Sequence, residues 1–228
     1  MSYYDLFIES FKPTKNQINQ LDKYASLIKE YNQVMNLTGI DEYQEVYLKH
    51  FYDSMLIKPL LDQLDYNNIA DLGSGAGLPG IVLAIMYPDK QFFLIEPITK
   101  RANFLKIVVE TLALENVVVI NKRMEEVKEK FDIIVSRAVA NLNILLELSI
   151  PFLNIGGYLI ALKGNKGKNE ADLATGAMEK LDCQLVKIDE QQLPDNQGER
   201  SNLLIKKDRE TNSKYPRNYG QIKKSPLK

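Results

Sequence analysis

The sequence has few of the side chains that carry most metal, thiol and acid–base chemistry. Its 228 residues include one cysteine, one histidine and no tryptophan. A single cysteine, Cys183, excludes an internal disulfide and any zinc site built from several cysteines, and it fits a reducing compartment. The single histidine, His50, has no second histidine or cysteine with which to bind a metal or form a nucleophilic relay. We therefore expect no metal site, and structural roles for both residues.

Long apolar runs are also absent, as is any excess of charge of one sign. No apolar stretch approaches the roughly 20 residues that cross a membrane, and the N-terminus lacks the basic and apolar regions of a signal peptide. The chain has 29 basic and 30 acidic residues, so no overall field indicates a nucleic-acid partner. These absences predict a cytoplasmic protein without a membrane partner.

The first 65 residues have the periodicity of helices. Apolar residues recur at intervals of three and four from Ile18 to Tyr31, and Thr14 stands where an N-cap is expected. A second apolar helical pattern runs from Val46 to Leu60. We interpret residues 1–65 as an N-terminal helical extension.

From residue 66 onward, short β-rich runs alternate with helical ones, which is typical of βαβ units and a parallel sheet. Strands are expected at 67–71, 91–95, 117–121, 131–136 and 157–162, and helices at 78–87, 99–113 and 141–150. Two final β-rich runs, 184–190 and 201–206, are separated only by a polar loop, which favours an antiparallel hairpin. Residues 66–206 are thus predicted to form one α/β sheet with helices on both faces.

The basic residues of the chain collect at its C-terminal end. Residues 207–228 carry a net charge of +5, which leaves −6 on the rest of the chain. This segment has no periodicity and contains Pro216, Gly220 and Pro226, so we expect an extended, flexible tail. Its charge makes it a candidate for contacts with phosphates.

The most informative segment of the sequence is the glycine-rich loop that follows the first expected strand. Asp71 leads into glycines at positions 73, 75 and 77, and an apolar helical run follows. Such a turn brings bare backbone against a ligand, because glycine has no Cβ and accepts positive φ. A dinucleotide site prefers the spacing G-x-G-x-x-G, whereas the spacing here is G-x-G-x-G. The loop resembles the first motif of S-adenosylmethionine-dependent methyltransferases, although a dinucleotide-dependent oxidoreductase stays open at this point.

An acid also ends the second expected strand. Glu96 lies 25 residues after Asp71, where a carboxylate can accept hydrogen bonds from both hydroxyls of a ribose. Dinucleotide and S-adenosylmethionine enzymes both use such an acid. Glu96 therefore indicates an adenosine-containing ligand without deciding between the two classes.

Two kinds of nucleic-acid methylation are disfavoured by what the sequence lacks. The segment after the fourth strand, Ser136-Arg137-Ala138, contains no Pro-Pro-aromatic run of the kind that grips an exocyclic amine. Methylation at carbon 5 of a pyrimidine needs a cysteine nucleophile, and Cys183 lies far from any motif and is interpreted as a small apolar residue.

Several blocks, in order along nearly the whole chain, resemble one family. The chain is similar to the small-subunit ribosomal RNA methyltransferase G family, also called glucose-inhibited division protein B. The blocks that carry the resemblance are 35–38, 50–54, 71–80, 100–105, 123–126, 136–138, 162–164, 198–200, 214–217 and 224–227. The most specific are Gly-Leu-Pro-Gly at the end of the glycine loop and Ser-Arg-Ala after the fourth strand.

The resemblance implies a Rossmann-like class I fold and transfer of a methyl group from S-adenosylmethionine to N7 of one guanine in 16S rRNA. The substrate would be the small ribosomal subunit or an assembly intermediate, and we expect a monomer. Two departures from the family pattern are Ala76, where many members have proline, and Gly220-Gln221-Ile222 in the tail.

The resemblance and the loop together predict the site residues. The expected cofactor contacts are Gly73, Gly75, Gly77, Leu78, Glu96, Met124, Glu125 and Arg137. Candidates for orienting the target base or its phosphates are Arg200, Lys163 and Asn36. No catalytic residue is assigned, because guanine N7 has a free lone pair and no proton to lose. A non-enzymatic RNA-binding factor in ribosome assembly, which keeps the fold without the activity, is the further alternative.

Overall fold

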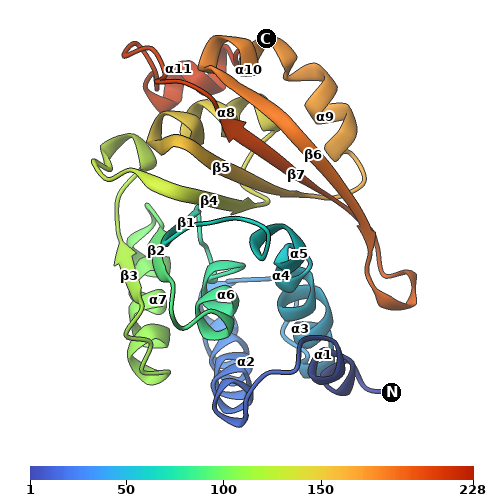
Figure 1. The fold of residues 1–228 in the computed structure, drawn as a ribbon. Helices are drawn as coiled ribbons and strands as arrows, with labels where there is room; N and C mark the ends of the chain where they lie inside the picture. The colour runs from blue at the N-terminus through green and yellow to red at the C-terminus, as the bar shows by residue number, and fades with distance from the viewer.

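The computed structural model describes all 228 residues as one seven-stranded sheet with helices on both sides (Figure 1). The strands lie in the order β3-β2-β1-β4-β5-β7-β6. Their bounds are β1 Asn68–Leu72, β2 Gln91–Ile95, β3 Val117–Ile120, β4 Phe131–Arg137, β5 Leu153–Lys163, β6 Cys183–Gln192 and β7 Glu199–Lys207. The first five strands pair in parallel, and β7 pairs antiparallel with both β5 and β6. The expected parallel sheet and its terminal hairpin are confirmed.

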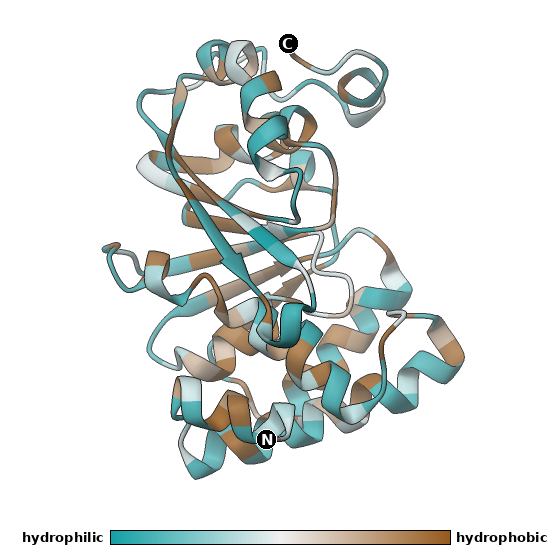
Figure 2. Ribbon diagram, turned by 90° about the vertical axis from the view of Figure 1, so that its right-hand side faces the viewer, coloured by the Kyte–Doolittle hydropathy of each residue, from teal (hydrophilic) through white to brown (hydrophobic).

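Helices divide between the two faces of the sheet, each with its own buried cluster. One face is covered by α1 Tyr3–Phe11, α2 Lys15–Met35, α3 Tyr43–Val46, α4 Asp53–Met55, α5 Lys58–Leu61, α6 Gly80–Met86 and α7 Thr99–Thr111. The other carries α8 Leu142–Ser149, α9 Gly167–Leu173, α10 Thr175–Leu181 and α11 Tyr219–Lys224. The helices show alternating hydrophobic and hydrophilic residues, as expected for elements with one buried face (Figure 2).

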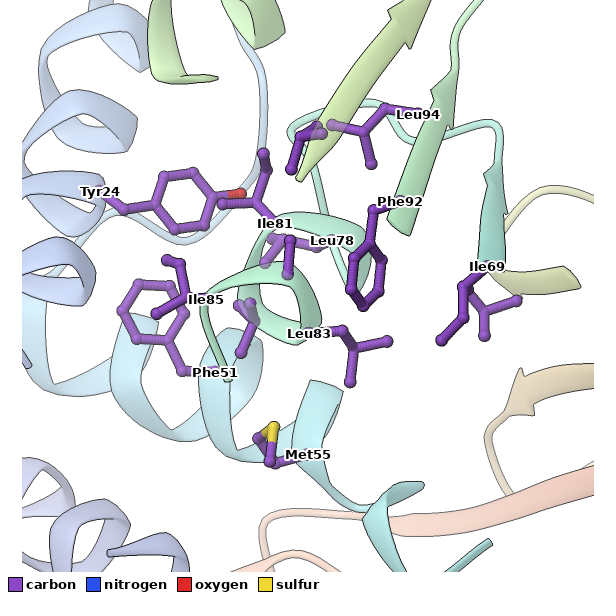
Figure 3. Packing of buried hydrophobic residues seen from close by; sticks show 14 of the residues in the cluster. Tyr24, Phe51, Met55, Ile69, Leu78, Ile81, Leu83, Ile85, Phe92 and Leu94 are labelled. Carbon is purple, nitrogen blue, oxygen red and sulfur yellow. The ribbon is translucent and has the colours of Figure 1, made fainter. Parts of the chain in front are cut away.

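The N-terminal extension shares its core with the sheet. Tyr24 on α2 and Phe51 stack at 5.5 Å between ring centroids, and both lie in the same cluster as Ile81 on α6 and Phe92 on β2. Figure 3 shows these side chains interlocking between helices and strands. Thr14 caps α2 as expected, since its side chain accepts a hydrogen bond from Gln17 N and the side chain of Gln17 accepts one from Thr14 N. The extension is therefore packed as part of the sheet's own core.

The second expected helix of the extension is broken in the structure. A π-helical turn, Tyr47–Tyr52, lies between α3 and α4, and a turn at residues 56–57 separates α4 from α5. Ser54 Oγ donates to the carbonyl of His50 at 2.6 Å, a back-bond that bends helices. Apolar periodicity alone does not reveal such a turn, and π-turns recur at functional sites.

Two short helices, α9 and α10, lie where no helix is predicted, between the fifth and sixth strands. Each has seven residues, which is too short for a helical period to stand out from the sequence. They cover the hairpin side of the sheet, where Ala171, Ala177 and Leu181 are buried.

The C-terminal segment differs from the extended tail that its sequence predicts. Residues 219–224 form α11, and the side chains of Ile222 and Leu227 are buried in the cluster beneath α8. Arg217 donates to both carboxylate oxygens of Glu147 on α8, at 2.8 and 2.5 Å. Isolated apolar residues in a polar segment give no periodic signal, so only the tertiary contacts reveal this packing. No helix in the structure combines the length and the apolar character needed to span a bilayer.

Candidate active site

The register of the parallel strands brings the predicted site residues to one edge of the sheet. Leu72 pairs with Ile95, and Ile95 pairs with Ile120. On the other side of β1, Asp71 pairs with Val135, and Arg137 on β4 pairs with Leu162 on β5. The segments that follow these strands therefore meet at the carboxyl edge, where open α/β sheets bind their ligands.

The glycine loop folds back over the end of β2. Gly73 N and Ser74 N both donate to the carbonyl of Ile95, at 2.9 and 3.2 Å. Asp71, which is buried, accepts a hydrogen bond from Gly80 N at 3.0 Å and so closes the loop across its base. Burial raises the pKa of Asp71 to about 7.

Gly73 and Gly75 present bare backbone toward the carboxyl edge. Both have positive φ, +72° and +57°. A Cβ on Gly75 would have only the carbonyl of Gly73 near it, at 3.8 Å, so the space before Gly75 is open. A Cβ on Gly73 would lie 2.6 Å from Cγ2 of Val139, in the loop after β4. An open cradle at Gly75 fits a ligand that approaches the backbone closely.

Gly77 and Leu78 face the interior instead of the open edge. A Cβ on Gly77 would lie 2.6 Å from Ile81 and 2.9 Å from the hydroxyl of Tyr24. That hydroxyl donates to the carbonyl of Ala76 at 2.6 Å, so the extension holds the loop directly. The side chain of Leu78 is buried in the core. Gly77 thus serves packing against α2, and the side chain of Leu78 is part of the same core.

Glu96 is buried at the end of β2 and grips the glycine loop. Its carboxylate accepts hydrogen bonds from Gly75 N and from Ile98 N, each at 2.9 Å. These two bonds fix the orientation of the carboxylate beside the open backbone of Gly75. The arrangement fits a ribose hydroxyl pair, because ionised carboxylate oxygens can each accept more than one hydrogen bond.

Met124 and Glu125 lie in a single 3₁₀ turn, Met124–Glu126, after β3. The side chain of Met124 is buried among residues of the α8 side, and Glu125 is half-buried. Arg123 precedes the turn, and its guanidinium lies 5.4 Å from the ring centre of Tyr219 on α11. The C-terminal helix therefore contacts the residue directly before the turn that is expected to bind the cofactor.

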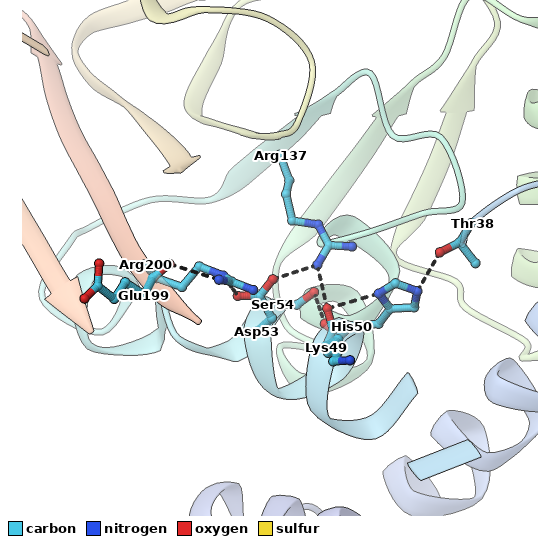
Figure 4. A network of polar contacts seen from close by, with 8 residues as sticks. All are labelled: Thr38, Lys49, His50, Asp53, Ser54, Arg137, Glu199 and Arg200. Carbon is cyan, nitrogen blue, oxygen red and sulfur yellow. Dashed lines mark hydrogen bonds and ion pairs between the residues drawn. The ribbon is translucent and has the colours of Figure 1, made fainter. Parts of the chain in front are cut away.

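Arg137 belongs to a polar network that the sequence does not predict (Figure 4). Its Nη1 donates to Asp53 Oδ2 at 3.1 Å and to the carbonyl of Lys49 at 3.3 Å. The other oxygen of Asp53 accepts from Nε of Arg200 at 2.6 Å. Asp53 comes from the extension, Arg137 from the end of β4 and Arg200 from β7, so one buried carboxylate joins three distant parts of the chain.

His50 lies beside this network, buried between Lys49 and Thr38. Its Nδ1 faces the carbonyl of Lys49 at 3.0 Å, so Nδ1 carries the proton and Nε2 accepts from the hydroxyl of Thr38 at 2.9 Å. Burial, with Arg137 nearby, lowers the pKa of His50 to about 4. The ring is therefore neutral at pH 7, and its two hydrogen bonds hold it in place.

Lys163 and Arg200 line one cavity at the carboxyl edge, and Asn36 does not. The cavity has a volume of about 490 Å³, and the loop 138–141 and Arg137 also line it. Lys163 Nζ donates to the carbonyl of Ala140 at 2.6 Å and pairs with Glu170 at 2.8 Å. Glu170 also accepts from Leu142 N, so Lys163 helps to hold the loop. Asn36 ends α2 in the left-handed conformation.

A larger cavity, of about 630 Å³, lies at the opposite edge of the sheet. It is lined by residues around the amino ends of β1 and β2, including Asn67 and Gln91, and by none of the predicted site residues. Since ligands of such sheets bind at the carboxyl ends of the strands, the smaller cavity is the relevant one.

Comparison with known proteins identifies the family. Residues 17–201 match the family described as rRNA small subunit methyltransferase G. The chain belongs to the rRNA small subunit methyltransferase G family. A relative of that name from Mycoplasma capricolum subsp. capricolum is 44% identical, over 98% of each chain. Another, from Staphylococcus epidermidis, is 40% identical over 94% of this chain and 92% of its own.

Solved structures that are similar to this chain share its fold. A ribosomal protein L11 methylase from Lactobacillus delbrueckii subsp. bulgaricus has a TM-score of 0.52 and 18% identity, over 71% of this chain and 79% of its own. A methyltransferase homolog from Pyrococcus horikoshii has a TM-score of 0.54 and 17% identity, over 68% and 66%. The sheet is thus that of class I S-adenosylmethionine-dependent methyltransferases.

The sequence alone does not place Asp53 or Val139 beside the predicted site residues. Asp53 stands in one of the blocks that carry the family resemblance, but neither its partner Arg137 nor Arg200 is near it in sequence. Val139 follows Arg137 closely, and only the fold shows that its side chain lies against Gly73.

Proposed function

We propose that this protein transfers the methyl group of S-adenosylmethionine to N7 of one guanine in 16S rRNA. The observation that carries the proposal is the glycine loop, open at Gly75 and gripped by Glu96, in a chain that matches the methyltransferase G family from residue 17 to residue 201. Neither a nicotinamide-dependent oxidoreductase nor a non-enzymatic assembly factor is supported by the family.

The chain's own contribution to this reaction is to hold and orient the reactants. When bound, S-adenosylmethionine supplies an electrophilic methyl group on a sulfonium that leaves as a neutral thioether. Guanine N7 has an in-plane lone pair and bears no proton, so the chain need not provide a general base. Alignment of nucleophile and methyl group can supply several kcal/mol of the barrier. His50, buried and bonded to Thr38, is consistent with this division of labour.

We assign the cofactor to the edge formed by the glycine loop, the end of β2 and the turn after β3. Gly73 and Gly75 offer backbone, Glu96 offers a carboxylate to the ribose, and the Met124–Glu125 turn offers its main chain to the adenine edge. Leu78 contributes its backbone, and Arg137 provides the positive charge beside the loop. Gly77 acts indirectly, through its packing against Tyr24.

The RNA is assigned to the neighbouring side of the same edge, with Arg200, Lys163 and Asn36 as contacts to the base or its phosphates. Arg200 and Lys163 share a cavity there. Bacterial ribosomal RNA is made and assembled in the cytoplasm, so this substrate implies that the enzyme acts in the cytoplasm. We expect the enzyme to act as a monomer on the small subunit or on an assembly intermediate.

The direct test is methyl transfer from labelled S-adenosylmethionine to small ribosomal subunits that lack N7-methylguanine, followed by mapping of the label. Label on one 16S guanine at N7 is the expected result. Tight cofactor binding without transfer would overturn the acceptor, and a folded protein that does not bind the cofactor would overturn the reaction class.

Gly73→Val tests the placement of the cofactor. The new side chain would collide with Val139, and the positive φ of Gly73 disfavours a β-branched residue. We expect isothermal titration calorimetry to show no S-adenosylmethionine binding. The matched control is Gly39→Val, because a Cβ at Gly39 meets no atom within 4 Å. Normal cofactor affinity in a folded Gly73→Val protein would contradict the placement.

A further inference from the structure

The carboxylate of Asp53 organises two guanidinium groups that would otherwise repel each other. Asp53 is 6% exposed, and its two oxygens bind different arginines, Arg137 at 3.1 Å and Arg200 at 2.6 Å. Its oxygens make no third contact with the protein beyond these two arginines. The π-helical turn directly before Asp53 and the bond from Ser54 to His50 set the position of its backbone.

Both arginines keep donors that no protein group uses. Only Nη1 of Arg137 donates hydrogen bonds, to Asp53 and to the carbonyl of Lys49, so Nε and Nη2 have no acceptor on the protein. Arg200 uses Nε and Nη1, on Asp53 and on the carbonyl of Glu199, and its Nη2 has none. A guanidinium has five N–H donors in a fixed plane. Both side chains are partly exposed, at 17% and 22%, and both line the cavity of about 490 Å³.

We propose that this cavity is a phosphodiester subsite for the RNA substrate, in which Arg200 contacts one phosphate and Asp53 positions Arg200 together with Arg137. The proposal rests on the proposed function, since it names the part of the RNA that the cavity takes. Planar guanidinium groups bind phosphate oxygens through parallel hydrogen bonds. Lys163 is the third cation of the cavity, although Glu170 already neutralises it.

The place of the cavity favours a phosphate close to the reacting base. Loop 138–141 forms one wall of the cavity, and Val139 in that loop lies against Gly73. A phosphate held by Arg200 would therefore be separated from the glycines assigned to the cofactor by loop 138–141. Asp53 then links two binding events, because the same carboxylate holds Arg137 on the cofactor side and Arg200 on the RNA side.

Arg200→Gln tests the subsite with small ribosomal subunits that lack N7-methylguanine and saturating S-adenosylmethionine. Loss of one charged hydrogen-bonding contact should raise KM for the subunits about tenfold. The plot of log kcat/KM against log potassium chloride concentration should flatten by about 0.7 to 1 in slope, at constant magnesium. Cofactor affinity, measured by calorimetry on the enzyme alone, should stay unchanged.

Lys58→Gln is the matched control, because it removes the same charge from a side chain that is 38% exposed, pairs with Asp62 and does not line the cavity. We expect wild-type KM and wild-type slope from it. Equal slopes for Arg200→Gln and Lys58→Gln would overturn the subsite. If wild-type enzyme itself does not methylate the subunits, the proposed function fails instead, so the two failures are distinguishable.

Asp53→Asn tests the positioning role separately. The neutral amide cannot hold both guanidinium groups, so this variant should raise KM for the subunits and also weaken S-adenosylmethionine binding, whereas Arg200→Gln changes only the first. Asp53→Glu, which keeps the charge, should restore part of both. A variant that loses thermal stability while KM and cofactor affinity stay at wild-type values would show that the network is structural only, and would overturn the role of Asp53.

Discussion

The N-terminal extension and the C-terminal segment each join the sheet domain through a buried carboxylate and an arginine. The two differ in which side supplies the carboxylate and which supplies the arginine. In the extension, Asp53 supplies the carboxylate, and the sheet supplies Arg137 and Arg200. At the other end of the chain Arg217 supplies the cation, and α8 supplies Glu147, which is fully buried. The first network lines a cavity at the carboxyl edge, and the second fastens a segment to a helix. The same chemistry thus lines an open cavity in one place and anchors a segment in the other, according to its position relative to the strand ends.

The comparison also shows why charge counted along a sequence misleads about binding surfaces. Several cations of the basic C-terminal segment already have protein partners. Lys207 is buried and donates to the carbonyl of Leu153, and burial lowers its pKa to about 8. Arg209 pairs with Asp182, and Arg217 with Glu147. A role for this segment in RNA binding stays a prediction that rests on its exposed lysines.

The largest expected effect is on stability, from Arg217→Gln. Glu147 has Arg217 as its only cation, so the substitution leaves a fully buried carboxyl group with the backbone N–H of residue 217 as a donor but no cation, and it should cost about 3 kcal/mol of unfolding free energy. Urea unfolding followed by circular dichroism measures it. Arg200→Gln should cost less, because Asp53 keeps Arg137. If the two variants lose equal stability, the distinction between an anchor and a binding network fails.

A second effect comes from His50, which holds the extension beside Asp53. Its folded pKa of about 4 lies below the usual 6.5, so between these values the unfolded chain binds a proton that the folded chain does not. Stability from this group is complete above pH 6.5 and falls as the pH drops toward 4, by up to about 3 kcal/mol.

The His50 effect must be measured as a difference, because Asp71 acts in the opposite direction. The raised pKa of Asp71 makes the folded state bind the extra proton over roughly the same pH range. Urea unfolding of wild type and His50→Gln at a series of pH values cancels the Asp71 contribution. The difference in unfolding free energy between wild type and His50→Gln should decrease as the pH falls from 7 to 4. A difference that is constant with pH would contradict a neutral, buried His50 ring.

The smallest expected effect is on the cofactor and comes from the C-terminal helix. Tyr219→Leu removes the ring over which Arg123 lies, next to the Met124–Glu125 turn. A cation–π contact at an exposed site is worth about 0.5–1 kcal/mol, so S-adenosylmethionine affinity should fall about threefold by calorimetry. Tyr215→Leu is the control, because the ring of Tyr215 faces Lys214. Equal S-adenosylmethionine affinities for the two variants would show that the C-terminal helix does not influence the turn at the cofactor site.

Elements with a strong local signal were predictable from the sequence, and contacts between distant segments were not. The apolar face and the Thr14 cap predict α2, and alternation of β-rich and helical runs predicts the parallel sheet. The π-helical turn before Asp53 and the two seven-residue helices after β5 leave no clear period in the sequence. The prediction of an extended tail was wrong, because the buried residues Ile222 and Leu227 are isolated in the sequence and form no repeating apolar pattern.

The sequence by itself determined the fold class and predicted the edge of the sheet at which the cofactor binds, since glycine spacing and strand-end acids are local features that parallel strands bring together. It also identified the family, through short blocks in a fixed order. Only the tertiary structure decided that Gly77 faces Tyr24 while Gly75 faces open space, and that Asp53 joins Arg137 to Arg200. These outcomes depend on the direction of side chains from segments up to 147 residues apart, which no local pattern encodes.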